Sequence, residues 1–225
     1  MTVASGPVLL VEDHELLAQS LGVALEAEGL DVVLAPLADG ADVLAVAADH
    51  RPAVVLLDLD LGEGRASGEA LVPGLTDLGA RVVVVSGASD VLRLGTCLEL
   101  GAVAVLSKSR PFEDVLAAVM AAQEGRPVMR DGDRQDLLAK LRQRRAEEKE
   151  RRAPFEQLTP REREVLCLLM DGTAAEGIAK HFVVSEATVR TQIRGVLTKL
   201  GVSSQLAAVA EARRVGWEGP APRER

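Results

Sequence analysis

From residue 7 to about residue 125, short apolar runs alternate with longer stretches in which apolar positions recur every three or four residues. Such runs are typical of buried parallel strands, and the longer stretches are typical of helices that cover a sheet. The strands are predicted at residues 8–12, 32–35, 53–58, 81–86 and 103–107, and the helices at residues 15–28, 40–50, 69–78, 90–100 and 111–124. This pattern predicts an α/β domain with a doubly wound, five-stranded parallel sheet.

The pattern changes at the end of this region, which we place at residue 127. Gly125, Pro127 and Gly132 interrupt regular structure, and charged residues dominate from residue 134 to residue 152. Three leucines between residues 137 and 141 form one short apolar stripe. Residues 128–154 are therefore expected to form a partly helical linker whose charged side chains face water.

After the linker, four helix start signals follow one another closely. Thr159, Pro160 and Glu162 form the pattern of a capping box, and Gly172 suits the end of that helix. A second helix is predicted up to about residue 181, a third at 186–200 behind a serine cap, and a fourth from about residue 204 to residue 215. Residues 155–217 are expected to fold as a small all-α domain with four helices, and residues 218–225 as a flexible tail.

Composition and charge restrict where nucleic acid can bind. The hydrophobic share of 48% supports buried cores, and 225 residues suffice for two small domains. Residues 1–130 carry 8 Lys and Arg against 19 Asp and Glu, whereas residues 155–225 carry 10 against 9. The acidic part argues against nucleic-acid binding there, and the last part can bind DNA only if its basic side chains share one face.

The remaining sequence features indicate a cytoplasmic protein with no membrane partner. Cys97 and Cys167 are far apart and have no second ligand at metal spacing, so we expect neither a disulfide framework nor a zinc site. The first residues lack a basic signal region, and no apolar run is long enough to cross a bilayer.

Polar residues follow four of the five predicted strands. Glu12 and Asp13 end the first strand, Asp58 the third and Ser86 the fourth, and Lys108 follows the fifth. In an open parallel sheet, ligands collect beyond the carboxyl ends of the strands, at the point where strand order reverses. Three carboxylates gathered there would repel one another unless a cation held them, and Mg²⁺ prefers such oxygen ligands.

This arrangement predicts phosphoryl chemistry. The Asp58 carboxylate can attack phosphorus in line and form an aspartyl phosphate, while the charge on the transferring group is stabilised by the metal and by Lys108. The Ser86 hydroxyl can donate a hydrogen bond to a phosphoryl oxygen, so phosphate can shift the loop after the fourth strand between two positions.

The segments VLLVEDH, VVLLDLDL, VVVVSGAS and VLSK contain these residues, and together they resemble the flavodoxin-like receiver domain of two-component response regulators over about residues 7–125. The resemblance implies a sensor histidine kinase as the phosphoryl donor. It also implies Asp58 as phosphoacceptor and metal ligand, Asp13 as a metal ligand with Glu12 nearby or acting through water, the backbone carbonyl of Asp60 as a further ligand, and Ser86 and Lys108 as phosphate contacts.

Three features depart from the receiver pattern. Gly62 stands where the family commonly has proline, and the following residues 63–67 are irregular, so a more mobile loop is expected. Val105 stands three residues before Lys108, where an aromatic side chain usually rotates inward on activation. The valine argues against the usual aromatic switch but leaves the phosphoryl chemistry intact.

LTPREREVLCLL and IAKHFVVSEATVRTQIRGVLTKLGVSS resemble the LuxR-type helix-turn-helix of NarL-like and FixJ-like regulators and span most of residues 155–217. The residues expected to face inward are Ile178, Val184, Val189, Ile193 and Leu197. Arg190, Thr191 and Arg194 would enter the major groove of double-stranded DNA, and Ser185, Thr188 and Lys199 would contact phosphates. In this family the last helix commonly forms the dimer contact, so we expect a homodimer and paired DNA half-sites.

These observations favour a transcription factor controlled by phosphorylation rather than an enzyme. One alternative is an atypical regulator that responds to a ligand or a protein and takes no phosphate, which the departures at Gly62 and Val105 keep open. Another starts from Asp58-Leu59-Asp60, which looks like the DxD of haloacid-dehalogenase-type phosphatases. Those enzymes carry DxD after their first strand, whereas here it follows the third, so we expect no turnover of free phosphate esters.

Overall fold

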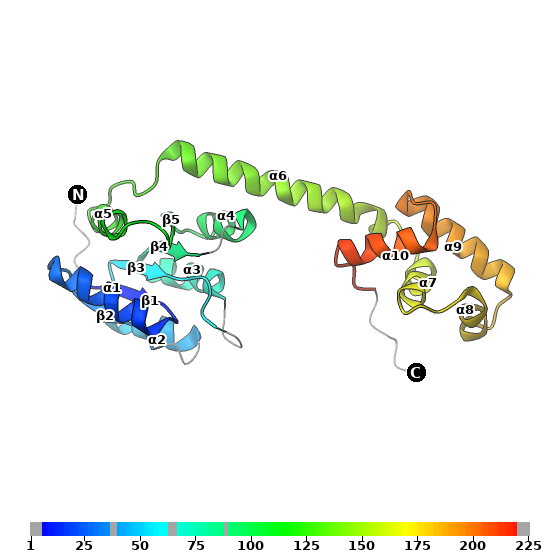
Figure 1. Ribbon diagram of the computed structural model, residues 1–225, viewed down its shortest axis with the longest axis horizontal. Helices are drawn as coiled ribbons and strands as arrows, with labels where there is room; N and C mark the ends of the chain where they lie inside the picture. The colour runs from blue at the N-terminus through cyan, green and yellow to red at the C-terminus, as the bar shows by residue number, and fades with distance from the viewer. Residues whose placement is uncertain (1–5, 37–39, 63–66, 88–89, 220–225) are drawn as a thin grey trace. The chain divides into compact units, whose positions relative to one another are not determined.

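Five parallel strands form the centre of the N-terminal part of the chain (Figure 1). The computed structural model describes residues 6–36, 40–62, 67–87 and 90–219, and it divides into two compact units, Met1–Arg142 and Gln143–Arg225. The strands are β1 (Val8–Val11), β2 (Val32–Leu34), β3 (Val54–Leu57), β4 (Arg81–Ser86) and β5 (Ala104–Ser107), in the order β2-β1-β3-β4-β5. The predicted doubly wound parallel sheet is confirmed.

Helices cover both faces of this sheet and form two separate cores. They are α1 (Glu15–Ala27), α2 (Gly40–His50), α3 (Gly68–Asp77), α4 (Val91–Glu99) and α5 (Phe112–Gln123). Buried side chains of α1 and α5 pack against alternate strand residues such as Leu10 and Leu56, and those of α2, α3 and α4 pack against the other set, including Val11 and Leu57. Because the central strands β1, β3 and β4 are covered on both faces, they are apolar almost throughout, which explains their continuous hydrophobic runs.

The linker is a more regular helix than its sequence predicts. Helix α6 runs from Asp131 to Glu156 without a break, through Gly132 near its start and Pro154 near its end. Pro154 falls in the last turn and cannot donate a backbone bond there, and the buried Phe155 fixes that turn in the core of the C-terminal unit. Leu141 is fully buried in the N-terminal unit, so the first residues of α6 belong to that unit.

The C-terminal unit contains the four predicted short helices, α7 (Pro160–Met170), α8 (Ala175–Phe182), α9 (Glu186–Leu200) and α10 (Gln205–Arg214). The capping box of Thr159 and Glu162 is present, and the hydroxyls of Ser185 and Ser204 accept backbone hydrogen bonds at the starts of α9 and α10. The apolar positions predicted to face inward are buried or half-buried, except Val184, which is 36% exposed in the turn between α8 and α9.

Both cysteines are free, with Cys97 buried and Cys167 half-buried. Within the described ranges, no helix combines the length and the apolar character that a membrane span needs. The predicted irregular loop at residues 63–67 and the predicted flexible tail at residues 218–225 fall largely outside the described residues.

Val183 ends α8 in a backbone conformation that suits glycine. Its φ is 56° and its ψ is 48°, in the left-handed region, and its side chain is 89% exposed. A β-branched residue is strained there, and little packing is lost when it is removed. Val183→Gly is therefore expected to raise the free energy of unfolding by about 1 kcal/mol.

Denaturant unfolding followed by fluorescence measures this effect, because Trp217 is the single tryptophan of the chain and packs against Phe155 in the C-terminal unit. Ala210→Gly is the matched control, since Ala210 is exposed within α10. At this ordinary helical position, glycine should destabilise by about 1 kcal/mol. Equal destabilisation by the two glycines would refute the strain at Val183.

Candidate functional site

The carboxyl ends of β1, β3, β4 and β5 carry the polar residues that the sequence singles out. Glu12 and Asp13 follow β1, Asp58 follows β3, Ser86 ends β4 and Lys108 follows β5. Ligand atoms of Glu12, Asp13 and Asp58 lie within 4.8 Å of one another, although the residues come from distant parts of the chain. β1 lies between β2 and β3, so the cluster forms where the order of the strands reverses.

Lys108 joins the carboxylates of two strands. Its Nζ lies 2.9 Å from Asp58 Oδ2 and 2.7 Å from Glu12 Oε2. The Asp58 side chain is 1% exposed and that of Glu12 is 6% exposed, whereas the Lys108 side chain remains 20% exposed. The single ammonium therefore compensates two carboxylates that are almost removed from water.

Burial and hydrogen bonding act in opposite directions on this cluster. Burial raises the pKa of Asp58, and the hydrogen bond from Lys108 offsets only part of this rise. Burial alone would lower the pKa of Lys108, but its hydrogen bonds to Glu12 and Asp58 raise the pKa above the usual value. The cluster thus favours the charged lysine and makes a second positive charge near Asp58 favourable.

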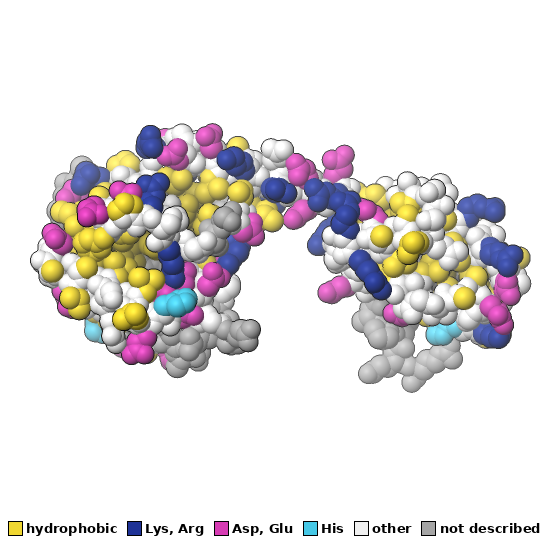
Figure 2. Space-filling model, viewed as in Figure 1, with side chains coloured by type: hydrophobic (Ala, Val, Ile, Leu, Met, Phe, Trp, Pro, Cys, Tyr) yellow, Lys and Arg dark blue, Asp and Glu magenta, His cyan; other side chains and the backbone are white. Residues whose placement is uncertain are grey.

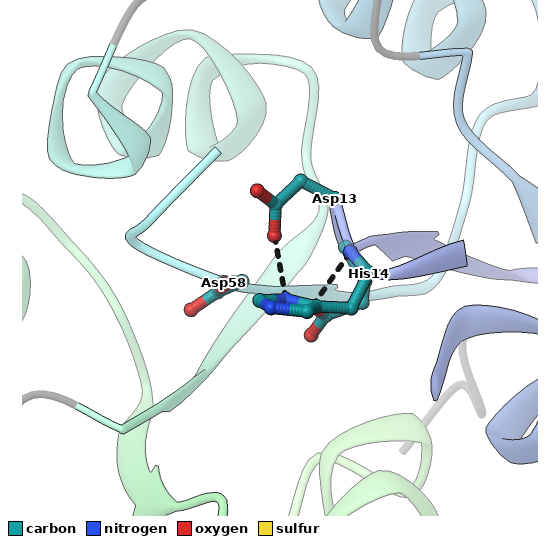
Figure 3. Close-up of side chains that lie close together, drawn as sticks. Asp13, His14 and Asp58 are labelled. Carbon is teal, nitrogen blue, oxygen red and sulfur yellow. Dashed lines mark hydrogen bonds and ion pairs between the residues drawn. The ribbon is translucent and has the colours of Figure 1, made fainter. Parts of the chain in front are cut away.

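His14 is a fourth member of this cluster, which the sequence pattern does not single out. It is the N-cap residue of α1, and its Nδ1 lies 3.0 Å from Glu12 Oε1 and 2.9 Å from Asp13 Oδ1. Figure 3 shows the Asp13 carboxylate pointing toward the His14 ring, with the Asp58 carboxylate beside them. The hydrogen bond to Glu12 and the charge of Asp13 raise the pKa of His14.

The carboxylate oxygens of this cluster are suitable ligands for a hard divalent cation. Asp13 Oδ1 is buried and accepts no hydrogen bond from any residue in the described ranges, because the nearby His14 nitrogen lies outside hydrogen-bond geometry. A buried carboxylate oxygen without a donor is costly unless a cation or water meets it. Oxygen ligands from Asp13, Asp58 and Glu12 are those that Mg²⁺ prefers.

Ser86 ends β4, which lies between β3 and β5, and its side chain is buried, with the residue only 1% exposed. Its backbone carbonyl accepts a hydrogen bond of 3.0 Å from the backbone N–H of Lys108, so the ends of β4 and β5 are held together. The two residues predicted to contact phosphate are therefore neighbours across these strands.

The side chain of Asp60 lies outside the carboxylate cluster. It is 59% exposed and accepts a hydrogen bond of 2.7 Å from Arg93 in α4, a partner that the sequence analysis missed. Gly62, two residues later, has a φ of 91°, which proline cannot adopt, so the loop after β3 follows a path that excludes the residue commonly found there. Val105 is half-buried against the core beneath α2, α3 and α4.

Gly68 allows α3 to pack directly on the backbone of the loop after β3. A Cβ built at this position would overlap the carbonyl oxygen of Asp58 and lie 2.6 Å from the Cα of Leu59. Because backbone atoms cannot rotate away, Gly68→Ala is expected to destabilise the N-terminal unit by about 1–3 kcal/mol or more.

Denaturant unfolding followed by circular dichroism, which reports on both units, measures this loss. Gly132→Ala is the control, because a Cβ at Gly132 in α6 meets no atom within 4 Å. A helical alanine there should stabilise by no more than about 1 kcal/mol. A neutral Gly68→Ala variant would show that α3 can move away from the loop.

The exposed face of α9 carries the residues predicted to read DNA. Arg190, Thr191 and Arg194 are exposed, whereas Val189 and Ile193 on the other side are buried in the core with α7 and α8. Figure 2 shows Lys and Arg side chains, with acidic side chains among them, on the visible surface of the C-terminal unit over α8 and α9. Although the C-terminal unit is nearly neutral, basic side chains lie on the exposed face of α9.

The six predicted DNA contacts differ in their present partners. Arg190 pairs with Glu186 at 2.9 Å, and the Ser185 hydroxyl caps α9 and lies 2.9 Å from the Thr188 hydroxyl. Lys199 is half-buried, and its Nζ lies 2.6 Å from Glu162 of the capping box. Burial raises the pKa of Glu162, but hydrogen bonds from Lys199 and Thr159 outweigh this and lower it. Lys199 therefore ties α9 to the start of α7.

Comparisons with known proteins divide the chain in the same way. Residues 8–120 match the family described as response regulator receiver domain, and residues 156–212 match the family described as bacterial regulatory proteins, luxR family. The transcriptional regulatory protein LiaR of Bacillus subtilis is 31% identical over 92% of this chain and 96% of its own length. The probable transcriptional regulatory protein NarL of Mycobacterium tuberculosis is 32% identical over 92% of this chain and 93% of its own.

Solved structures are similar in fold. A LuxR-family two-component response regulator from Aurantimonas covers 61% of this chain and 98% of its own, with a TM-score of 0.52 and 23% identity. The response regulator RcsB in a complex with DNA covers 93% of this chain and 98% of its own, with a TM-score of 0.50 and 22% identity.

Proposed function

The chain belongs to the response regulators that join a receiver domain to a LuxR-family DNA-binding domain, and from this premise we propose that phosphorylation of Asp58 controls its binding to DNA. The protein is a transcription regulator by family. In the proposal, a sensor histidine kinase in the cytoplasm phosphorylates Asp58 in the receiver domain, which comprises residues 1–127. Residues 128–154 connect the two domains, and a dimer binds DNA through residues 155–217. The family favours neither the phosphorylation-independent regulator nor the DxD phosphatase.

One observation carries this proposal: Lys108 bridges Asp58 and Glu12 at the carboxyl edge of the sheet, beside a buried Asp13 oxygen that accepts no hydrogen bond from the described residues and lies 2.9 Å from His14 Nδ1. Asp58 Oδ2 then attacks the phosphorus of the donor, a P–O bond to Asp58 forms, and the P–N bond to the donor histidine breaks. The Lys108 ammonium exchanges a carboxylate oxygen for a phosphoryl oxygen, and the Ser86 hydroxyl donates to a second one.

Asp13, Asp58, the backbone carbonyl of Asp60 and Glu12, directly or through water, would hold Mg²⁺. When bound, this ion neutralises negative charge on the carboxylates and on the transferring phosphoryl group. The rest of the site is supplied by the chain itself: β1, β3 and β5 hold their terminal residues in fixed register, and burial keeps the Asp58 carboxylate out of bulk water.

At the other end of the chain, we propose that α9 lies in the major groove. Arg190, Thr191 and Arg194 would contact base edges, while Ser185, Thr188 and Lys199 would contact phosphates that set the orientation. For Lys199, a phosphate contact requires that the ion pair with Glu162 be exchanged or shared. Dimerisation through α10, where Leu206 is 80% exposed, would place two such helices on paired half-sites.

Phosphorylation by phosphoramidate tests the proposal. The purified chain is incubated with phosphoramidate and Mg²⁺, the intact mass is measured, and the affinity for a duplex selected from random sequences is compared before and after. The expected result is one phosphoryl group on the wild type that hydroxylamine or alkali removes, none on Asp58→Asn, and an altered affinity for the wild type only. If the wild type takes no phosphate yet binds the duplex, regulation by another ligand or protein replaces this proposal.

A further inference from the structure

A single arginine connects the phosphoacceptor loop with α4. From the third position after the Asp90 cap, Arg93 Nη1 donates to Asp60 Oδ1 at 2.7 Å, Nη2 donates to the Leu59 carbonyl at 3.1 Å, and Nε pairs with Glu69 at the start of α3. Its side chain is 31% exposed and that of Glu69 is 17% exposed. We call these contacts among Arg93, Leu59, Asp60 and Glu69 the Arg93 clamp.

The clamp lies one residue from the Asp58 carboxylate. Leu59 is buried, and its N–H donates to Asp58 Oδ1 at 2.7 Å while its carbonyl accepts from Arg93. A change in the Asp58 carboxylate that alters the hydrogen bond from the Leu59 N–H therefore also acts on Leu59 as the acceptor for Arg93. The planar guanidinium fork allows all three contacts at once, which a lysine cannot reproduce.

The other side of α4 is held by the first part of α6. Arg134 donates to the carbonyls of Leu98 and Ala102 at 3.1 Å each, just where α4 ends and β5 approaches. The fully buried Leu141 packs so closely on α4 that a Cβ at Gly95 would lie 2.9 Å from the Leu141 Cβ. Helix α4 thus contacts the phosphoacceptor loop at one end and the linker helix along its length.

From this arrangement we propose that Arg93 is the positioning residue that couples the state of Asp58 to α4, and through α4 to the receiver end of α6. The clamp holds the first turn of α4 against residues 59–60 in the unphosphorylated protein. A phosphoryl group on Asp58 rearranges the Leu59 amide and weakens the clamp, so the first turn of α4 loosens. This inference rests on the proposed phosphorylation of Asp58.

Hydrogen exchange of the full chain tests the inference, with beryllofluoride and Mg²⁺ as the phosphoryl mimic. In the wild type, the mimic should accelerate exchange of the amides of residues 91–99. Without the mimic, Arg93→Ala should already accelerate exchange there by about tenfold, since charge-assisted hydrogen bonds are lost at a partly exposed site. Adding the mimic should then change exchange in α4 by less than about twofold.

Arg126→Ala is the matched control, because Arg126 forms a surface pair with Glu124 after α5. Arg93→Lys should behave like the alanine variant, because a lysine cannot make the three contacts of the guanidinium at once, and circular dichroism checks that each variant folds. Unchanged α4 exchange in Arg93→Ala, or a response to the mimic as large as that of the wild type, would overturn the inference. A wild type that binds no mimic refutes the proposed phosphorylation instead, and exchange without the mimic still tests the clamp.

Discussion

Replacing Lys108 by methionine is expected to abolish phosphoryl transfer to Asp58 and to lower the free energy of unfolding of the N-terminal unit by about 1–3 kcal/mol without Mg²⁺. The reason is the same for both effects. Methionine keeps the apolar stem and leaves the carboxylates of Glu12 and Asp58, which are 6% and 1% exposed, without their ammonium partner. The loss stays below that of a fully buried pair because the Lys108 side chain is 20% exposed.

Urea unfolding followed by circular dichroism, with and without Mg²⁺, measures this prediction alongside phosphoramidate labelling. Mg²⁺ should restore more stability to Lys108→Met than to the wild type, because the ion meets carboxylates that have lost their lysine. Arg110→Met is the control, since Arg110 forms a surface pair with Asp114 at 3.0 Å. A Lys108→Met variant that is labelled as fast as the wild type would remove Lys108 from the chemistry.

Arg194→Ala is expected to weaken specific DNA binding by about tenfold or more while the fold stays intact. Arg194 is exposed in the middle of α9 and makes no ion pair with a residue that the structure describes, so its fork is available for a base edge without first breaking a pair. Arg190, by contrast, must exchange its contact with Glu186.

Fluorescence anisotropy with a selected duplex and with a scrambled duplex measures this effect. Arg194→Ala should reduce the ratio between the two affinities, whereas Arg144→Ala on the exposed surface of α6 should leave that ratio unchanged. Equal losses on both duplexes for Arg194→Ala would assign Arg194 to a phosphate contact rather than to sequence reading.

Most of the fold follows from local patterns in the sequence. The central strands of the sheet are buried on both faces, so their apolar runs are easy to recognise, and the five predicted strands differ from β1 to β5 by at most one residue at either end. The caps of α7, α9 and α10 depend on hydroxyls close in sequence to the amides they bind, which makes them readable too. The α6 helix was underestimated because packing of Leu141 and Phe155 overrides the local signals of Gly132 and Pro154.

The candidate site was predicted as far as strand ends determine it. Parallel strands place Glu12, Asp58 and Lys108 at the same carboxyl edge of the sheet. The apolar pattern of the strands does not predict which other side chains contact them. The position of His14 depends on the turn into α1, and the contacts of Arg93 depend on how α4 packs against α3. The pairing of Lys199 with Glu162 likewise depends on the crossing of α7 and α9. The contacts of Arg93 and Lys199 join side chains far apart in sequence and therefore leave no periodic signal.

The most direct test is a crystal structure of the full chain with Mg²⁺ and beryllofluoride. It should show beryllium bonded to Asp58, Lys108 and Ser86 in contact with fluorine atoms, and Mg²⁺ held by Asp13, Asp58 and the Asp60 carbonyl, with Glu12 bound directly or through water. If the Asp58 carboxylate remains paired with Lys108, with no beryllium and no cation beside Asp13 at saturating concentrations, the site does not accept phosphate and the account of its regulation is wrong.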